Sequence, residues 1–263
     1  MQDNFKFKKA LGQNFINDPK LIDKIVDSVL IDKDTLVVEI GPGAGALSVR
    51  IVSKAGFTLL YEVDERLELY LLKLLKDYDN KKVIISDFLG VDVDKEISKY
   101  DYDKFYVVAN LPYYITTAII TKILDMKRKP DKLVVMVQKE VADRLEAKPG
   151  SRDYGAISVY LSYFYDVKKL FDVDRNYFTP VPKVDSAVVL MERKNNIDEI
   201  DQKLFLEVIR IAFQFKRKNL RNNFKKFDLD MFAQILDKYG YSLNDRAEDL
   251  PLDVFVELTK NWK

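Results

Sequence analysis

Short apolar runs alternate with amphipathic segments through most of the chain. Five runs have the length and composition of buried strands, and they cover residues 36–40, 57–62, 82–86, 105–110 and 133–138. Segments with helical spacing follow them, at residues 45–54, 65–77, 94–99, 116–127 and 139–147. Strands that are apolar throughout, each followed by a helix, predict a parallel sheet that is covered on both faces.

The pattern differs at both ends of this region. Asp18-Pro19 has the form of a capped helix start, and apolar residues with helical spacing follow it. Two later apolar runs, near 165–171 and 185–192, can add a hairpin at one edge of the sheet. From Asp201 onward the periodicity is only helical. We therefore predict a first domain over residues 1–195 and a small all-helical domain over residues 196–263.

Composition narrows the chemistry. Hydrophobic residues make up 48% of the 263 residues, enough for a large core, and the net charge is only +1. We find no apolar run of about 20 residues and no signal peptide, so we expect a cytoplasmic protein with no membrane contact. The chain contains no cysteine and no histidine. This excludes thiolate chemistry and histidine bases, and leaves carboxylates, amides, hydroxyls, backbone groups or a cofactor, with no metal expected.

The first predicted strand leads into a glycine-rich turn, Gly41-Pro42-Gly43-Ala44-Gly45. Glycines between a strand and a helix let the backbone approach a ligand closely, and doubly wound folds bind nucleotides at this place. A dinucleotide-binding loop and a tight turn without any ligand are alternatives, because this pattern alone is a weak signal.

Two acids mark the ends of the next strands. Glu62 closes the second strand and Asp87 follows the third. An acid at the position of Glu62 can accept hydrogen bonds from both ribose hydroxyls of a nucleoside, in a dinucleotide or elsewhere. An acid at the position of Asp87 can accept from an adenine amino group, or it can simply cap the next segment. Together with the glycine-rich turn, these acids indicate a nucleoside site.

The fourth strand ends in Asn110-Leu111-Pro112-Tyr113, which resembles the signature of methyltransferases that act on exocyclic amines. The lone pair of such an amine is delocalised into the ring, so the amine is a poor nucleophile. The Asn110 side-chain oxygen and the Leu111 carbonyl can accept both amino hydrogens, which frees the lone pair. Pro112 stiffens the turn, and Tyr113 offers a face for an extruded base. The structural alternative is a capping asparagine followed by a turn proline.

Further segments, in order along nearly the whole chain, resemble the ribosomal RNA adenine dimethyltransferases, the family of bacterial KsgA and its eukaryotic relatives. These segments cover residues 11–15, 138–145, 154–159, 178–186, 217–223 and 246–248. The resemblance implies a class I S-adenosylmethionine-dependent methyltransferase fold, Rossmann-like with a mostly parallel seven-stranded sheet, followed by a helical C-terminal domain. It implies N6,N6-dimethylation of two adjacent adenosines in the 3′-terminal hairpin of small-subunit (16S) rRNA, with S-adenosylhomocysteine as the product.

The resemblance also assigns roles to residues. It implies that Asn14 and Ile16 help to hold the cofactor, and that Gly41, Gly43, Glu62, Asp87 and Asn110 share this role. Phe178 is a candidate second aromatic wall for the target base, or an ordinary core phenylalanine. Two departures from the family pattern are Ile16, where leucine is usual, and Asn219, where threonine is usual. A backbone contact would survive the first, and the second concerns only the surface of a helix.

A run without acids in the predicted helical domain is the candidate RNA contact. Its basic residues are Lys216, Arg217, Lys218, Arg221, Lys225 and Lys226. Taken alone, such a run can be a solvated helix face. In a domain that resembles an rRNA-docking module, phosphate contact becomes the favoured interpretation. Lys6, Lys8 and Lys9 can add to it, or form a basic tail. The expected partner is small-subunit rRNA in a pre-30S particle, bound by a monomer that takes part in small-subunit biogenesis.

Three alternatives stay open at this point. Methyltransferases that modify large-subunit rRNA and confer antibiotic resistance share the cofactor and catalytic motifs, although residues 138–145 and 217–223 favour the small-subunit enzymes. A non-catalytic ribosome-assembly or transcription factor could retain the fold, but it has no physical need for an intact catalytic turn. A dehydrogenase would leave the Asn110–Tyr113 turn unexplained.

Overall fold

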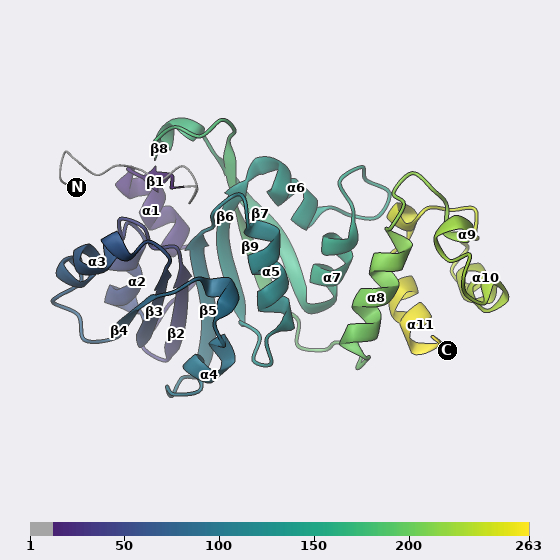
Figure 1. The fold of residues 1–263 in the computed structure, drawn as a ribbon, viewed down its shortest axis with the longest axis horizontal. Helices are drawn as coiled ribbons and strands as arrows, with labels where there is room; N and C mark the ends of the chain where they lie inside the picture. The colour runs from purple at the N-terminus through teal and green to yellow at the C-terminus, as the bar shows by residue number, and fades with distance from the viewer. Residues whose placement is uncertain (1–12, 263) are drawn as a thin grey trace. The chain divides into compact units, whose positions relative to one another are not determined.

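The computed structural model describes residues 13–262, and a seven-stranded sheet is its central feature (Figure 1). The strand order is β4-β3-β2-β5-β6-β9-β7. The strands are β2 (Thr35–Ile40), β3 (Phe57–Glu62), β4 (Lys81–Ile85), β5 (Lys104–Asn110), β6 (Lys132–Gln138), β7 (Tyr165–Val173) and β9 (Ser186–Arg193). Strands β2 to β6 pair in parallel, and β9 pairs antiparallel with β6. The predicted parallel sheet with two strands added at one edge is thus confirmed.

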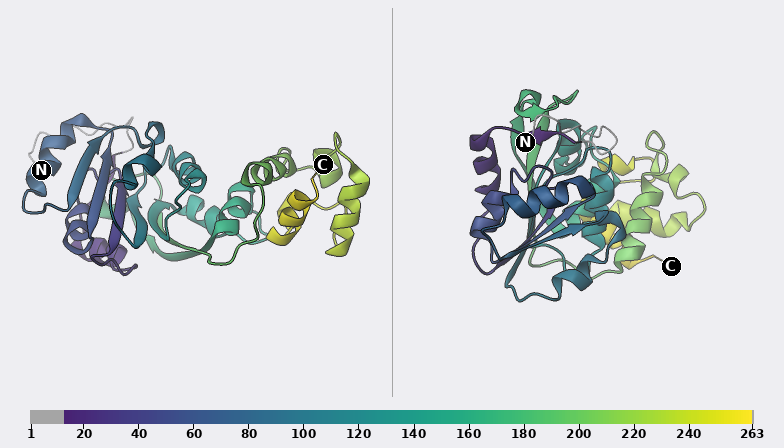
Figure 2. Two further views of the ribbon diagram at one scale, coloured as in Figure 1. Left: turned by 90° about the horizontal axis from the view of Figure 1, so that it is seen from below. Right: turned by 60° about the vertical axis from the view of Figure 1, so that its left-hand side comes forward.

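Helices cover both faces of this sheet (Figure 2). They are α1 (Pro19–Val26), α2 (Ser48–Lys54), α3 (Glu68–Leu74), α4 (Val93–Ile97) and α5 (Thr116–Asp125). Helices α1 and α2 share one face, where their apolar residues join a core cluster with Val37, Val108, Val134 and Met136 of the strands. Figures 1 and 2 show α4 and α5 on the opposite face. Full coverage explains why the strands are apolar at successive positions.

Helix α1 illustrates how the local sequence sets an element. The Asp18 side chain accepts a hydrogen bond from the Leu21 amide at 2.6 Å, and Pro19 occupies the first turn. Both features favour a helix start because they deal with amide groups that have no partner within the helix. The buried face of α1 carries Leu21, Ile22, Ile25 and Val26, which anchors it to the sheet.

The strand order places the site. Chain order runs outward from β2 to β3 and β4, and then returns across β2 to β5 and β6. The direction of winding therefore reverses between β2 and β5, and in doubly wound folds ligands bind beside such a reversal. A short strand, β1 (Phe15–Ile16), pairs antiparallel with β8 (Phe178–Thr179) in a separate two-stranded sheet.

The chain forms two compact units. Within the described residues, the first unit runs to residue 142 and resumes over 168–193, and the second comprises residues 143–167 and 194–262. Residues 143–167 thus group with the C-terminal helices, although the predicted first domain ran to residue 195. The predicted domain boundary between residues 195 and 196 stays a prediction, because it concerns which segments fold independently.

The second unit is largely helical. Its helices are the end of α6 (Lys139–Glu146), α7 (Ala156–Phe164), α8 (Gln202–Ala212), α9 (Leu220–Asn223), α10 (Leu229–Lys238) and α11 (Leu252–Lys260). Aromatic rings fill its core: Phe213 stacks on Phe255 with centroids 5.9 Å apart, and Tyr163 lies 4.9 Å from Phe205. Every described element after Asp201 is helical, as the periodicity predicted. Over residues 13–262, no helix has both the length and the apolar character needed to cross a bilayer.

Candidate active site

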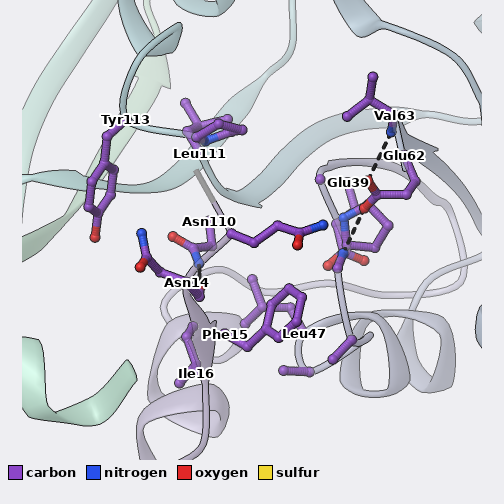
Figure 3. A pocket seen from close by; sticks show the side chains of 17 residues that line it. Asn14, Phe15, Ile16, Glu39, Leu47, Glu62, Val63, Asn110, Leu111 and Tyr113 are labelled. Atoms are coloured by element: carbon purple, nitrogen blue, oxygen red, sulfur yellow. Dashed lines mark hydrogen bonds between the residues drawn. The ribbon is translucent and has the colours of Figure 1, made fainter. Parts of the chain in front are cut away.

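A pocket lies where β2, β3 and β5 end, and the segment around β1 closes one side of it (Figure 3). Most of the residues that the sequence assigned to a cofactor or to catalysis line this pocket. They are Asn14, Ile16, Gly41, Gly43, Glu62, Asn110, Leu111, Pro112 and Tyr113. The fold therefore brings together four segments that are distant in the sequence.

The charge of the pocket has one sign. Among the residues that the structure describes, Glu39 and Glu62 are the only charged ones that line it, so this wall holds two acidic side chains and no basic one. Figure 3 shows both acids on the side away from Tyr113. A wall of this kind favours a ligand with positive charge and disfavours one with a phosphate chain, because unbalanced charge is costly where water is excluded.

Glycine is required at Gly41 and at Gly43 in the loop after β2. Gly41 and Gly43 have φ angles of 68° and 55°, a conformation that residues with side chains rarely adopt. At Gly43 a methyl group would also lie 2.6 Å from Cε1 of Phe15. The loop backbone and the N-terminal segment therefore approach each other at a distance that only glycine allows.

Glu62 is held by three backbone amides. Its Oε2 accepts from the Gly43 amide at 3.0 Å, and its Oε1 accepts from the Val63 and Asp64 amides, both at 2.9 Å. Its side chain is buried, with 4% of the residue exposed. Burial raises the pKa of Glu62, and the three amides oppose that shift. A carboxylate offers about four acceptor positions, so one remains on Oε2 for a ligand hydroxyl.

Glu39 was not assigned a role from the sequence, yet it is the most strongly perturbed acid of the pocket. It is 1% exposed, and its Oε2 has no hydrogen-bond partner among the described residues. Burial, assisted by the nearby Glu62 carboxylate, raises the pKa of Glu39 to about 8. A buried oxygen without a partner in a ligand pocket indicates a group that a ligand completes. The signal available in the sequence was an acid two residues before the glycine loop, within an otherwise apolar run.

The amide of Asn110 is held in one orientation. Its Nδ2 donates to the Asn14 carbonyl at 3.0 Å, as Figure 3 shows. Since the nitrogen is engaged by a carbonyl acceptor, the Oδ1 atom is the one left to accept hydrogen bonds. The backbone at Asn14 therefore fixes the direction in which the acceptor oxygen of the Asn110 amide points.

The turn after Asn110 is fixed from two sides. The Thr116 hydroxyl, at the start of α5, donates to the Pro112 carbonyl at 3.0 Å. The Tyr113 hydroxyl lies 2.5 Å from Oγ of Ser186, a fully buried residue of β9. Burial raises the pKa of the Tyr113 phenol, so the hydroxyl stays protonated at neutral pH. The ring of Tyr113 is thus anchored at its far end.

The N-terminal segment has its own anchor, which the sequence did not reveal. The Gln13 side chain donates to Oδ2 of Asp64 at 2.8 Å, and Arg66 contacts the same carboxylate at 2.6 Å. The Arg66 guanidinium and the Gln13 amide hold the pKa of Asp64 well below its usual range. This links the segment that carries Asn14 to the turn after Glu62.

Two predicted site residues do not line the pocket. Asp87 is exposed, and its side chain accepts from the Leu89 amide at 2.9 Å, so it caps the segment that follows, as the structural alternative had it. Phe178 is 1% exposed and belongs to the core cluster beneath the sheet. Phe178 pairs with Ile16 in the small sheet, and its ring lies in the core and not in the pocket wall.

The predicted RNA-binding residues lie in the second unit, in and around α9. Lys216, Arg217, Lys218, Arg221, Lys225 and Lys226 are all exposed. Asn219 caps α9, since its Oδ1 accepts from the Asn222 amide at 3.2 Å, so asparagine serves where the family has threonine. Lys6, Lys8, Lys9, Leu11 and Gly12 lie outside the described residues.

Known proteins resemble this chain over nearly its whole length. A family model described as "Ribosomal RNA adenine dimethylase" matches residues 4–262. A protein of Clostridium acetobutylicum named "Ribosomal RNA small subunit methyltransferase A" is 40% identical over 260 residues, which is 97% of this chain and 94% of that protein. A protein of the same name from Bacillus cytotoxicus is 41% identical over 266 residues, covering 97% of this chain and 91% of that protein.

Solved structures with the same fold cover both units. A dimethyladenosine transferase from Plasmodium falciparum has a TM-score of 0.80 and 25% identity, covering 93% of this chain and 95% of that one. The 23S rRNA methyltransferase ErmE has a TM-score of 0.73 over 94% of this chain and 98% of its own, at 24% identity. The second likeness concerns the fold alone.

Proposed function

This chain belongs to the ribosomal RNA adenine dimethylase family, and we propose on that premise that it methylates N6 of adenosines in small-subunit rRNA, with S-adenosylmethionine as the donor. The substrate is two adjacent adenosines in the 3′-terminal hairpin, each of which becomes N6,N6-dimethyladenosine. Relatives at about 40% identity that carry the small-subunit name over nearly the full chain support this assignment.

The single observation that carries the choice of cofactor is that the charged residues of the pocket wall, over residues 13–262, are acids. Glu39 and Glu62 are its charged lining residues. A nicotinamide dinucleotide would bring a pyrophosphate to this wall, whereas S-adenosylmethionine brings a sulfonium and an ammonium group. When bound, it supplies a methyl group on a positively charged sulfur. The unpartnered Oε2 of Glu39 fits a cationic group of this kind.

The remaining contacts of the cofactor follow from the pocket. Gly41 and Gly43 permit close approach of the loop backbone. Glu62 accepts one ribose hydroxyl at its remaining position on Oε2. The side chain of Ile16 is buried in the core, so its contribution comes from the backbone, and Asn14 lies beside it. Asp87 does not line this pocket; its proposed contact with the adenine amino group rests on its place after β4 and uses the carboxylate oxygen that does not cap Leu89.

Asn110 carries the chemical step. Its Oδ1 and the Leu111 carbonyl accept the two hydrogens of the adenine amine, which localises the lone pair on nitrogen. The Asn14 carbonyl holds Nδ2, so the amide needs no reorientation when the substrate arrives. Tyr113 stacks on the base, and its anchored hydroxyl keeps the ring in place. A proton leaves the nitrogen to solvent as the methyl group is transferred.

The second unit docks the RNA. Lys216, Arg217, Lys218, Arg221 and Lys225 are exposed and can replace the counterions of phosphates. The substrate is a pre-30S particle in the cytoplasm, and the enzyme acts as a monomer. In the same particle it can serve subunit assembly in addition to catalysis.

The test is transfer of labelled methyl groups from S-adenosylmethionine to small subunits that lack the modification, followed by nucleoside analysis. We expect N6,N6-dimethyladenosine at adjacent positions near the 3′ end. Incorporation into large-subunit RNA instead would support the resistance-type reaction. No incorporation into either, with retained binding to the particle, would support a non-catalytic assembly role.

A further inference from the structure

The turn between α8 and α9 is held rigid from inside the second unit. The Asn223 side chain, 6% exposed, donates to the Ala212 carbonyl at 2.7 Å. Its Oδ1 accepts from the Phe215 amide at 3.2 Å. The Phe215 carbonyl in turn accepts from the Lys218 amide at 2.8 Å. One buried amide thus joins both ends of the turn and fixes where Phe215 projects.

Two phenylalanines of this turn have opposite environments. Phe213 stacks on Phe255, and Tyr154 packs against its edge. Phe215 is 49% exposed, and among the described residues no aromatic ring or cation packs on its face. A single exposed apolar side chain is common and needs no explanation by itself. Here, however, the ring is exposed on a backbone that is fixed by hydrogen bonds.

The charge around Phe215 distinguishes it further. Lys216, Arg217 and Lys218 follow it directly, and all three are exposed. Within residues 13–262 none of them pairs with a carboxylate; Lys216 donates to the Arg152 carbonyl at 3.1 Å. The turn therefore presents a bare aromatic face beside three uncompensated positive charges. Grooves that bind single-stranded nucleic acid combine these two elements, with bases stacked on rings and phosphates near the cations.

We propose that Phe215 stacks on an unpaired RNA base, so that the turn between α8 and α9 binds an RNA loop or single strand and not only a regular helix. This rests on the proposed function, which makes RNA the partner of the second unit. The role of the basic residues is to hold the backbone, and the role of Phe215 is to select an unpaired nucleotide. In a regular duplex the bases are already stacked on each other, so no base face is available.

The test measures binding of the full chain to an oligoadenylate of about 12 nucleotides and to a blunt RNA duplex of the same length. Phe215→Ala weakens binding of the single strand by about 5- to 100-fold and leaves its salt dependence unchanged, because the cations that neutralise phosphates are all retained. Binding of the duplex stays within about twofold of wild type. Phe215→Trp retains single-strand binding, whereas Phe215→Leu behaves like the alanine variant, since only an aromatic face stacks.

Tyr239→Ala is the matched control. Tyr239 is an aromatic residue of the same unit, 40% exposed, and lies outside the basic turn. Single-strand binding of Phe215→Ala or Phe215→Leu at the wild-type level overturns the proposal, and so does an equal loss for strand and duplex. Neither binding measurement requires methyl transfer. Loss of stacking at Phe215 can therefore be told apart from failure of the proposed methylation, which is read from modified nucleosides.

Discussion

In the pocket of the first unit, the charged side chains among the described residues are Glu39 and Glu62, which are acidic and at most 4% exposed. Around α9 of the second unit, by contrast, every charged side chain from 216 to 226 is basic and exposed. The acids are held in place: three backbone amides fix Glu62, and burial keeps Glu39 protonated over much of the pH range. The basic residues are exposed, and within residues 13–262 none of them forms an ion pair with a carboxylate.

This difference shows two ways to use charge. A buried carboxylate discriminates among small ligands, since only a cation of matching shape compensates its desolvation. Exposed cations discriminate little by themselves and act by their number, because each phosphate that they neutralise releases counterions. Changes in the pocket should therefore affect the reaction steeply, while changes near α9 should affect RNA affinity gradually.

The largest effect is expected in the first unit, at the catalytic turn. Asn110→Ala removes an acceptor for the adenine amine and should lower kcat by about 10²- to 10³-fold, as loss of one transition-state hydrogen bond does elsewhere. Single-turnover methyl transfer measures this, with RNA binding as the control. Turnover within a few-fold of wild type would remove Asn110 from the mechanism.

In the second unit, replacing Lys216, Arg217, Lys218 and Arg221 with alanine should weaken RNA binding and flatten its dependence on salt. The slope of log affinity against log salt should fall by about 0.7–0.9 for each phosphate that the variant no longer neutralises. Binding titrations at several salt concentrations measure this. Lys203 and Lys238, exposed lysines of the same unit, provide the control when both are changed to alanine. If the slope did not change, the basic residues would be a solvated surface that does not contact RNA phosphates.

The pH dependence of cofactor binding tests the buried acid. Because the pKa of Glu39 is about 8 in the free pocket, a cation that binds there should displace a proton. Affinity for S-adenosylmethionine should rise by up to about tenfold per pH unit below that value and level off above it. Calorimetry in buffers of different protonation enthalpy detects the released proton. Glu39→Gln, which cannot titrate, should lose this dependence.

The same group affects the stability of the free protein. The pKa of Glu39 is raised from 4.5 to about 8 on folding, so between these values the unfolded chain has released a proton that the folded chain retains. The contribution of Glu39 to the free energy of unfolding therefore falls as pH rises through this window. If stability and cofactor affinity changed with pH in the same way in the wild type and in Glu39→Gln, this assignment would be wrong.

The smallest effect is expected at the anchor of the stacking residue. Tyr113→Phe retains the ring but leaves the buried Ser186 hydroxyl without its partner, so the free energy of unfolding should fall by about 1 kcal/mol. Methyl transfer should change only a few-fold, since the face that stacks on the base remains. Thermal unfolding and kcat together measure this. A loss of activity as large as that of Asn110→Ala would give the hydroxyl itself a role.

Most of the sheet could be read from the sequence because β2, β3, β5 and β6 are buried at nearly every position and are therefore apolar along most of their length. The β3 run was located at its observed bounds, Phe57–Glu62, and the β2 and β5 runs to within a residue. The site motifs were visible for a related reason: each lies at a strand end, where an apolar run stops at glycine, acid or asparagine. Phe178 shows where the sequence is not sufficient: the residue type alone does not distinguish a phenylalanine of the core from one that lines a binding site.

The amino-acid sequence by itself determined the fold class, the helical C-terminal region, the family and the residues that gather at the pocket, because these depend on local periodicity and on short motifs. Only the tertiary structure decided what depends on packing between distant segments. It left Oε2 of Glu39 without a hydrogen-bond partner among the described residues in the pocket wall, oriented Asn110 through the backbone at Asn14, and placed Phe178 in the core. It also covered Phe213 and exposed Phe215 two residues later. Burial and hydrogen-bond partners arise from contacts across the chain, and no local pattern records them.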